Sequence, residues 1–150
     1  AYDPGGRSLA AGCSDGTIKT WELAGGRELQ TFRKHLGRVY GVAFRPDGKV
    51  LASCGEDGTV RFWHPEAGTE LRSISAHALS VKSIAFHPGG RFLVSGGYDR
   101  LIKLWNAEDG TALGTLSGHE DEIYQVAFSP DGRRIASCGR AHSLRLWQRR

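Results

Sequence analysis

The sequence lacks any long apolar run: no stretch approaches the roughly 20 consecutive apolar residues that a membrane-spanning helix requires. It also lacks a cysteine pattern. Cys13, Cys54 and Cys138 are an odd number and match no metal-ligand spacing, which argues against a disulfide framework. A large excess of one charge is missing as well, since 20 Lys+Arg stand against 16 Asp+Glu. We therefore expect no membrane partner, and a nucleic-acid or acidic partner is permitted but not demanded.

Phosphate-binding loops are missing too, because the glycine pairs match neither the dinucleotide-binding pattern nor the P-loop. Glycine itself is abundant, with 21 residues. The glycines are spaced regularly between apolar runs, which indicates many tight turns rather than disorder. This composition predicts an all-β protein, and a chain of 150 residues is long enough for a sizeable core.

An internal repeat of 42 residues organises the chain. Four tryptophans follow one another at this interval: Trp21, Trp63, Trp105 and Trp147. The same interval relates three histidines, three aspartates and four proline-containing turns at 2–6, 44–48, 86–90 and 128–132. A fixed interval shared by several residue classes is the signature of a repeat architecture.

Each repeat contains four short segments rich in apolar or β-favouring residues. In the second repeat these expected strands, a to d, cover 39–44, 50–54, 59–63 and 70–74. Pro-Asp-Gly, Glu-Asp-Gly and Pro-Glu-Ala-Gly lie between them and supply the turn conformations of antiparallel hairpins. Each repeat is therefore predicted to form a four-stranded antiparallel meander. Because strands a and b carry apolar residues on both faces, the sheets are expected to stack face to face.

The repeats resemble the WD-repeat family, whose propeller blades run 40 to 45 residues with four strands each. The resemblance rests on His35, 44–48 (Phe-Arg-Pro-Asp-Gly), 51–53 (Leu-Ala-Ser), Asp57-Gly58 and 60–63 (Val-Arg-Phe-Trp), and it covers essentially the whole chain. The family's Trp-Asp pair is replaced in every repeat, as in Trp63-His64, and its Gly-His pair survives only as Gly118-His119. The resemblance implies an all-β propeller of four-stranded antiparallel meander blades.

The period divides the chain into four blade segments: 1–34 (strands b, c, d), 35–76, 77–118 and 119–150 (strands a, b, c). A ring of about seven blades would need roughly 294 residues, which is about twice this chain. The two end segments also cannot combine into one complete blade. Both contain strands b and c, so joining them would duplicate these two strands. We therefore expect an incomplete ring, an open arc whose end sheets lack cover, with further blades supplied by a larger parent protein.

A His, a Ser, an Asp and a Trp recur within the repeats, and the first three are the parts of a hydrolytic triad. The sets are His35, Ser53, Asp57, Trp63; His77, Ser95, Asp99, Trp105; and His119, Ser137, Trp147. Ala141 replaces the last Asp and Ala11 the first Ser. Because a catalytic site is needed once whereas this set recurs in step with the fold, we expect no catalytic residue and no enzyme. The resemblance implies a structural relay from Trp through Ser and His to Asp.

Metal and cofactor binding are not expected either. One relay histidine per blade leaves these side chains about a sheet spacing apart, which is too far for one zinc ion. The remaining histidines, His64, His87 and His142, have no ligand-like spacing.

The resemblance implies that protein or peptide partners bind on the face formed by the d–a and b–c loops. Two positions per blade vary there: an early residue of strand a and the residue before the relay Asp. They are Tyr40, Lys82 and Tyr124, and then Glu56, Tyr98 and Arg140. Tyrosine and arginine anchor many interfaces, so we expect these six residues to bind the partner. The simpler alternative is that Tyr and Lys merely suit strand surfaces.

Basic residues are concentrated near the end of the sequence: Arg133, Arg134, Arg140, Arg145, Arg149 and Arg150. They could meet phosphates, but they alternate with apolar residues as solvent-facing positions do. The main interpretation is therefore a non-enzymatic scaffold for protein–protein interaction. Two alternatives stay open: a regulatory or sensory propeller of a multidomain enzyme such as a kinase, and a basic propeller that contacts nucleic acid. The sequence leaves localisation and the identity of the partner open.

Overall fold

The computed structural model describes residues 1–140 and 142–148, and all regular secondary structure within them is β. The first sheet contains β1 (Ser8–Gly12), β2 (Thr17–Glu22) and β3 (Glu28–Arg33). The second contains β4 (Val39–Phe44), β5 (Leu51–Gly55), β6 (Thr59–His64) and β7 (Thr69–Ser75). The third contains β8 (Val81–Phe86), β9 (Phe92–Gly97), β10 (Ile102–Asn106) and β11 (Ala112–Leu116). The fourth contains β12 (Ile123–Phe128), β13 (Arg134–Gly139) and β14 (Leu144–Gln148).

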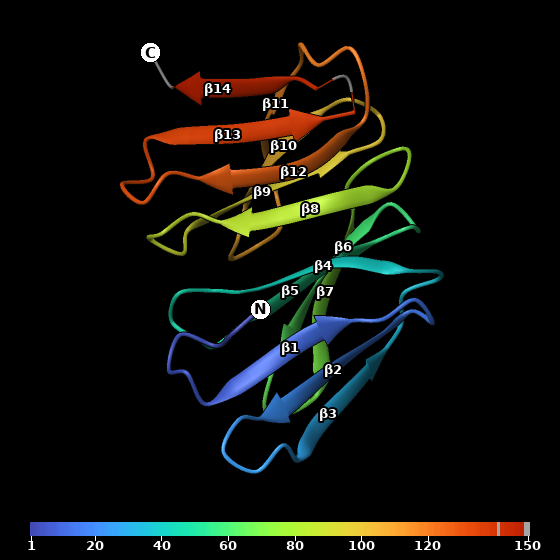
Figure 1. Ribbon diagram of the computed structural model, residues 1–150, viewed down its shortest axis with the longest axis vertical. Helices are drawn as coiled ribbons and strands as arrows, with labels where there is room; N and C mark the ends of the chain where they lie inside the picture. Colours follow the sequence, from blue (N-terminus) through green and yellow to red (C-terminus); the bar gives the residue numbers. More distant parts are fainter. Residues whose placement is uncertain (141, 149–150) are drawn as a thin grey trace.

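Every sheet is an antiparallel meander in which strands adjacent in sequence are also adjacent in space. Figure 1 shows the four sheets following one another along the long axis of the molecule, with the blue first sheet at one end and the red fourth sheet at the other. The arrangement is open, because the first and last sheets do not meet. The predicted fold class, four-stranded antiparallel blades in an incomplete ring, is confirmed.

Tight turns set the ends of the strands. The β5–β6 turn places Gly58 at a φ of 75°, a conformation that favours glycine, while the carboxylate of Asp57 accepts a hydrogen bond from the Thr59 N–H at 3.1 Å. A Cβ atom at Gly58 would lie 2.6 Å from the carbonyl oxygen of His77. The turn therefore requires glycine for two reasons, its backbone conformation and its close contact with the loop that leads to the third sheet.

The core consists of three layers of apolar side chains between consecutive sheets. In the middle layer, Val60 and Phe62 of β6 pack against Val81, Leu93 and Trp105 of the third sheet. The other two layers repeat this arrangement, with a strand-c residue of one sheet facing the tryptophan of the next. Each sheet thus turns its tryptophan toward the preceding sheet, which explains why apolar residues occupy both faces.

The end sheets differ from the middle ones because one face of each has no neighbour within the described residues. Leu144 and Leu146 of β14 stand where Val60 and Phe62 stand in β6, yet they are 72% and 66% exposed, whereas Val60 and Phe62 are fully buried. The expected uncovered end sheets are therefore present in the structure.

The first sheet contains slightly more than the expected strands b, c and d. Tyr2 forms an isolated antiparallel bridge with Leu9, and the backbones of Ala1 and Ala10 exchange two hydrogen bonds of 2.8 Å. Tyr2 is the counterpart of Phe44, the last residue of β4, so these first residues continue the position of strand a. Elsewhere the strands begin and end within one or two residues of the expected limits.

Candidate partner-binding face

Three β-bulges place the strand-a candidates on one end of the sheets. In the β4–β5 pair, Val39 is opposite Gly55 and Gly41 is opposite Cys54, so Tyr40 is the extra residue of a bulge. The register shifts in the same way around Lys82 in β8 and around Tyr124 in β12. A bulge leaves its extra residue without a cross-strand partner and changes the direction of its side chain. The repeat thus directs the same position of three sheets away from the regular strand pattern.

The second set of candidates lies in the b–c turns, beside the segments that precede strand a. In each of the last three sheets, the backbone N–H of the candidate donates to a carbonyl in that segment. The pairs are Glu56 to Arg38 at 2.8 Å, Tyr98 to Ser80 at 2.9 Å, and Arg140 to Glu122 at 3.0 Å. Both candidate positions of a sheet therefore lie at the same end of its strands.

Four of the six candidates form one continuous cluster across three sheets. The Lys82 ammonium lies 3.2 Å from the centroid of the Tyr40 ring and 4.4 Å from that of the Tyr98 ring. The Tyr98 and Tyr124 rings follow, with centroids 6.1 Å apart and planes tilted by 55°. We call Tyr40, Lys82, Tyr98 and Tyr124 the tyrosine–lysine cluster. Its contacts are cation–π and aromatic, so these side chains are held in place before any partner arrives.

The other two candidates make contacts within their own sheets. A Glu56 carboxylate oxygen accepts a hydrogen bond from the Arg38 N–H at 3.0 Å. The Arg140 guanidinium lies 3.6 Å from the Glu122 carboxylate. Both Glu56 and Arg140 are exposed, so they flank the tyrosine–lysine cluster instead of joining it.

Two effects act on the charge of Lys82. Partial burial lowers the pKa of its ammonium, while the neighbouring phenol groups of Tyr40 and Tyr98 raise it, and the net shift is upward. The side chain therefore stays positively charged at neutral pH.

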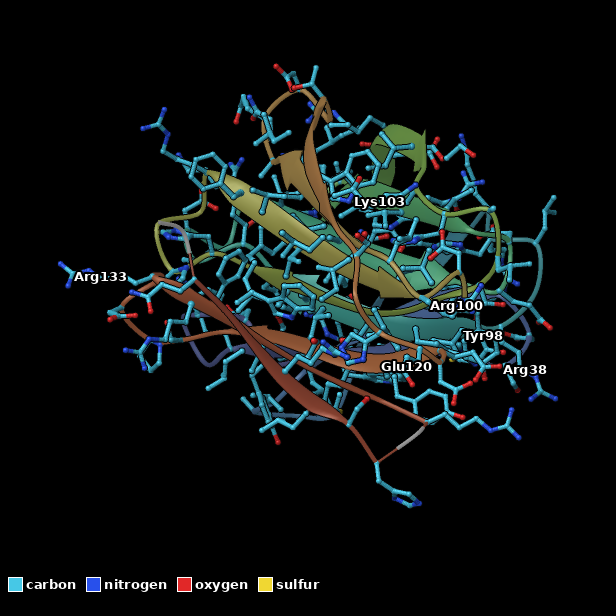
Figure 2. All side chains as sticks on the ribbon, turned by 90° about the horizontal axis from the view of Figure 1, so that it is seen from above. Arg38, Tyr98, Arg100, Lys103, Glu120 and Arg133 are labelled. Carbon is cyan, nitrogen blue, oxygen red and sulfur yellow. The ribbon has the colours of Figure 1, made fainter. Side chains whose placement is uncertain are left out.

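Three further residues lie at this end of the molecule and were not predicted from the sequence. Leu36 and Leu79, in the d–a loops, are 80% and 55% exposed. Arg100, in the β9–β10 turn, has a φ of 69° where the equivalent residues Gly16 and Gly58 are glycines. An apolar residue inside a turn and a non-glycine in a glycine position were the available signals. Figure 2 shows Arg100 and Tyr98 at the same end of the sheets as Arg38 and Glu120, with Arg133 at the opposite end.

The structure brings the side chains of both complete relays together. The Trp63 indole N–H donates to the Ser53 hydroxyl at 2.8 Å, and this hydroxyl lies 2.7 Å from Nε2 of His35. Nδ1 of His35 lies 3.0 Å from the Asp57 carboxylate. Because a carboxylate only accepts, Nδ1 carries the hydrogen and Nε2 accepts from the serine. The third sheet repeats this chain with Trp105, Ser95, His77 and Asp99, at 2.9, 2.7 and 2.8 Å.

The relay serines have no access to a substrate in this structure, because Ser53 and Ser95 are fully buried. Burial also lowers the pKa of His35 and of His77, against the opposite effect of their aspartate partners, so both rings are neutral at neutral pH. The aspartate end of the relay holds a loop: the Leu36 N–H donates to Asp57 at 2.9 Å. The relay therefore connects the core to the d–a loop beside the candidate face.

The fourth sheet contains a relay with a different last member. Trp147 donates to Ser137 at 2.8 Å, and Ser137 lies 2.7 Å from Nε2 of His119. Nδ1 of His119 lies 3.2 Å from the hydroxyl of Ser143, which occupies the position of Thr59. The expected replacement at Ala141 lies outside the described residues. Ser143 was not predicted from the sequence, because the repeat places the histidine's partner at the position of the aspartate.

The first sheet has no relay of this kind. Asp15 instead accepts hydrogen bonds from the N–H and the hydroxyl of Thr17, at 3.0 and 2.7 Å, and caps its own turn. No group of three or more possible metal ligands occurs among the residues that the structure describes.

The arginines near the end of the sequence do not gather in one place. Arg133 follows the β12–β13 turn, at the end of the sheets opposite Tyr98 (Figure 2). Arg140 pairs with Glu122 at the other end, and Arg134 and Arg145 lie on strands β13 and β14. Arg149 and Arg150 lie outside the described residues.

A groove of about 620 Å³ opens at the end opposite the candidate face, between the a–b turns of the second and third sheets. Its lining includes Arg45, Arg91, Phe92 and Glu108. Arg45 is already paired there, with Asp47 at 2.9 Å and Glu108 at 3.1 Å.

In the described part of the chain, no segment forms a helix that is long and apolar enough to span a membrane.

Stacked antiparallel meanders, three of which contain a Trp-Ser-His relay, define a β-propeller repeat protein. The chain belongs to the WD-repeat family: the family described as "WD domain, G-beta repeat" matches residues 1–22, 26–64, 68–106 and 110–148. Each of the last three matches begins with the outer strand of one sheet and ends with the third strand of the next. Among curated proteins, no sequence matches this chain. WD repeats form protein-interaction scaffolds, and the family is generally non-enzymatic and typically binds protein partners.

Proposed function

We propose that this chain is a non-enzymatic scaffold that binds a protein or peptide partner on the end formed by the d–a and b–c loops. The observation that carries the proposal is the tyrosine–lysine cluster, in which three residues at the same bulge position and Tyr98 of a b–c turn connect three sheets. The fold itself does not require the residue at the bulge to change from tyrosine to lysine between sheets. A position that differs between otherwise regular sheets is suited to recognition.

The surroundings of the cluster support a protein partner. Leu36 and Leu79 add exposed apolar surface, and Glu56 and Arg140 add exposed charge of both signs. Buried aromatic anchors surrounded by polar residues are the usual composition of a protein interface. The absence of catalytic activity is part of the proposal and is supported by the burial of Ser53 and Ser95.

We further propose that these four sheets form part of a larger ring. The support is the exposed outer face of β14, whose leucines have fully buried counterparts in β6. A neighbouring blade would cover Leu144 and Leu146 as the third sheet covers Val60 and Phe62.

Peptide selection tests the proposed face. Linear peptides selected from a displayed random library on the wild-type chain are measured against the double variant Tyr98→Ser with Tyr124→Ser. We expect the affinity to fall about tenfold or more, because aromatic anchors contribute most of the energy of such interfaces. The matched control, Lys49→Ser with Arg133→Ser, changes exposed residues at the opposite end and should bind normally. The proposal would be contradicted if the peptides bound the double tyrosine variant as tightly as wild type, or if only the control variant lowered their affinity.

A further inference from the structure

The ammonium of Lys82 is unusual among the charged groups of the candidate face. Tyr40 comes from the second sheet and Tyr98 from the same sheet as Lys82, and their rings lie 3.2 and 4.4 Å from the Lys82 nitrogen. Within the described residues, Lys82 has no carboxylate within 4.0 Å. An ammonium has three N–H donors, and two aromatic faces occupy at most two of them. At least one donor is therefore available for an oxygen from outside the chain.

The acids nearest in the repeat pattern already have partners. The Glu56 side chain holds the Arg38 N–H, and Glu122 pairs with Arg140. Neither carboxylate pairs with Lys82, although one buried oxygen of Glu122 has no hydrogen-bond partner. The cation between the rings is thus left without a carboxylate partner. Partial burial strengthens the attraction between such a cation and an external carboxylate, because less water competes for either charge.

A second cation lies two residues from Tyr98. Arg100 is exposed, and its φ of 69° costs a non-glycine residue free energy that glycine would avoid. At this position the first and second sheets have Gly16 and Gly58, with φ values of 86° and 75°, and the fourth sheet has another non-glycine residue, His142, at 53°. No carboxylate of the described residues pairs with the guanidinium of Arg100. Arg100 therefore adds a positive charge without a carboxylate partner beside the cluster.

We propose that Lys82, assisted by Arg100, binds the carboxylate of an Asp or Glu side chain in the partner, with an apolar neighbour of that residue packed on Tyr98 and Tyr124. This inference rests on the proposed function and specifies the chemistry of the partner. A carboxylate fits better than a phosphate, because phosphate recognition typically uses several arginines in bidentate contact, whereas Lys82 offers a single point charge.

The test uses peptides selected on wild-type chain and sequenced. We expect a fixed Asp or Glu in the peptides, and replacement of that residue by Asn or Gln should weaken binding about tenfold. The variant Lys82→Met, which keeps the length of the side chain, should show a similar loss and should no longer distinguish the acidic peptide from its amide. The variant Lys49→Met, at the opposite end, should bind like wild type. Arg100→Gly should retain or increase thermal stability and weaken binding.

The outcomes separate this inference from the proposed function. Peptides that need Tyr98 and Tyr124 but contain no fixed acid, or bind Lys82→Met as well as wild type, would overturn the carboxylate inference and leave the face intact. Peptides that bind only when phosphorylated would overturn it as well. Peptides that need neither the tyrosines nor Lys82 would overturn both.

Discussion

A buried serine hydroxyl stands at the centre of each relay and has two partners on opposite sides. In the second sheet the Ser53 hydroxyl accepts a hydrogen bond from the Trp63 indole N–H and donates one to Nε2 of His35. One serine thus provides a partner for a buried tryptophan and for a buried histidine. The relay ends at an aspartate that also holds the Leu36 N–H of the adjoining loop. Residues that resemble a triad therefore act as a connection between the packed layer and the loop that precedes strand a.

Removal of the aspartate or the histidine of a relay should destabilise the fold. Asp57→Ala removes the carboxylate that accepts from Nδ1 of His35 and leaves only the Thr59 hydroxyl, 3.3 Å away. His77→Ala removes the acceptor of the Ser95 hydroxyl and the donor to Asp99. Each variant should lower the free energy of unfolding by at least about 1 kcal/mol. Glu66→Ala, at an exposed turn position, should be near neutral. Urea denaturation curves measure all three. Coincidence of the three curves with that of wild type would show that the relay contributes nothing to stability.

The relay histidines should make stability depend on pH. Burial lowers the pKa of His35 and of His77 below the usual 6.5, so the unfolded chain takes up protons that the folded chain does not. Their contribution is therefore complete above about pH 6.5 and decreases as the pH falls toward the folded pKa, by up to about 1.4 kcal/mol per pH unit for each histidine.

Measurement of the free energy of unfolding at pH 7.5 and 5.5 checks this dependence. The variant His77→Gln should show a smaller difference between the two pH values than wild type. His64→Gln, at an exposed position, should retain the full difference. Equal stability of the wild-type chain at the two pH values would contradict the prediction.

At the scale of strands, the 42-residue period predicted nearly all of the fold. Turn residues such as Gly58 mark the strand ends, and consecutive apolar residues mark strands that are covered on both faces. The sequence could not predict the bulges, because a bulge depends on which residues pair across two strands. It placed Tyr40 and Lys82 on one face, but their 3.2 Å contact depends on the approach of neighbouring sheets. Ser143 was missed for a similar reason, because its hydroxyl replaces a carboxylate two positions earlier in the repeat.

Strands should differ in their protection from hydrogen exchange. All residues of β5 are buried, and β5 pairs with strands on both sides, whereas most residues of β11 and β14 are exposed and each lies at the edge of its sheet. Local opening requires less free energy where few apolar contacts are lost. Amide hydrogen–deuterium exchange should therefore be slowest in β5 and the inner part of β9, and fastest in β11 and β14. Uniform exchange rates across the four strands would refute this order.

The whole molecule is an arc whose two outer faces are complementary in kind. Between consecutive sheets, a strand-c face always packs against the tryptophan face of the next sheet, as Phe62 and Trp105 do. In the fourth sheet the strand-c face, with Leu144 and Leu146, is uncovered, and in the first sheet the tryptophan face, with half-buried Trp21, is uncovered. Two chains placed end to end would bring together the same kinds of surface that already pack three times within one chain.

We therefore predict that the 150-residue chain associates with itself as its concentration rises. Large exposed apolar faces favour association because burial of apolar area contributes about 25 cal/mol per Å². Replacing Leu144 and Leu146 by lysine should shift the chain toward monomer, since it places charge on the uncovered face. Leu113→Lys changes a leucine that is 48% exposed on the edge strand β11 and should leave association unchanged. Sedimentation equilibrium over a range of concentrations measures the difference. A stable monomer at every concentration, for wild type as for the double variant, would show that these faces tolerate water and would remove the support they give to a larger ring.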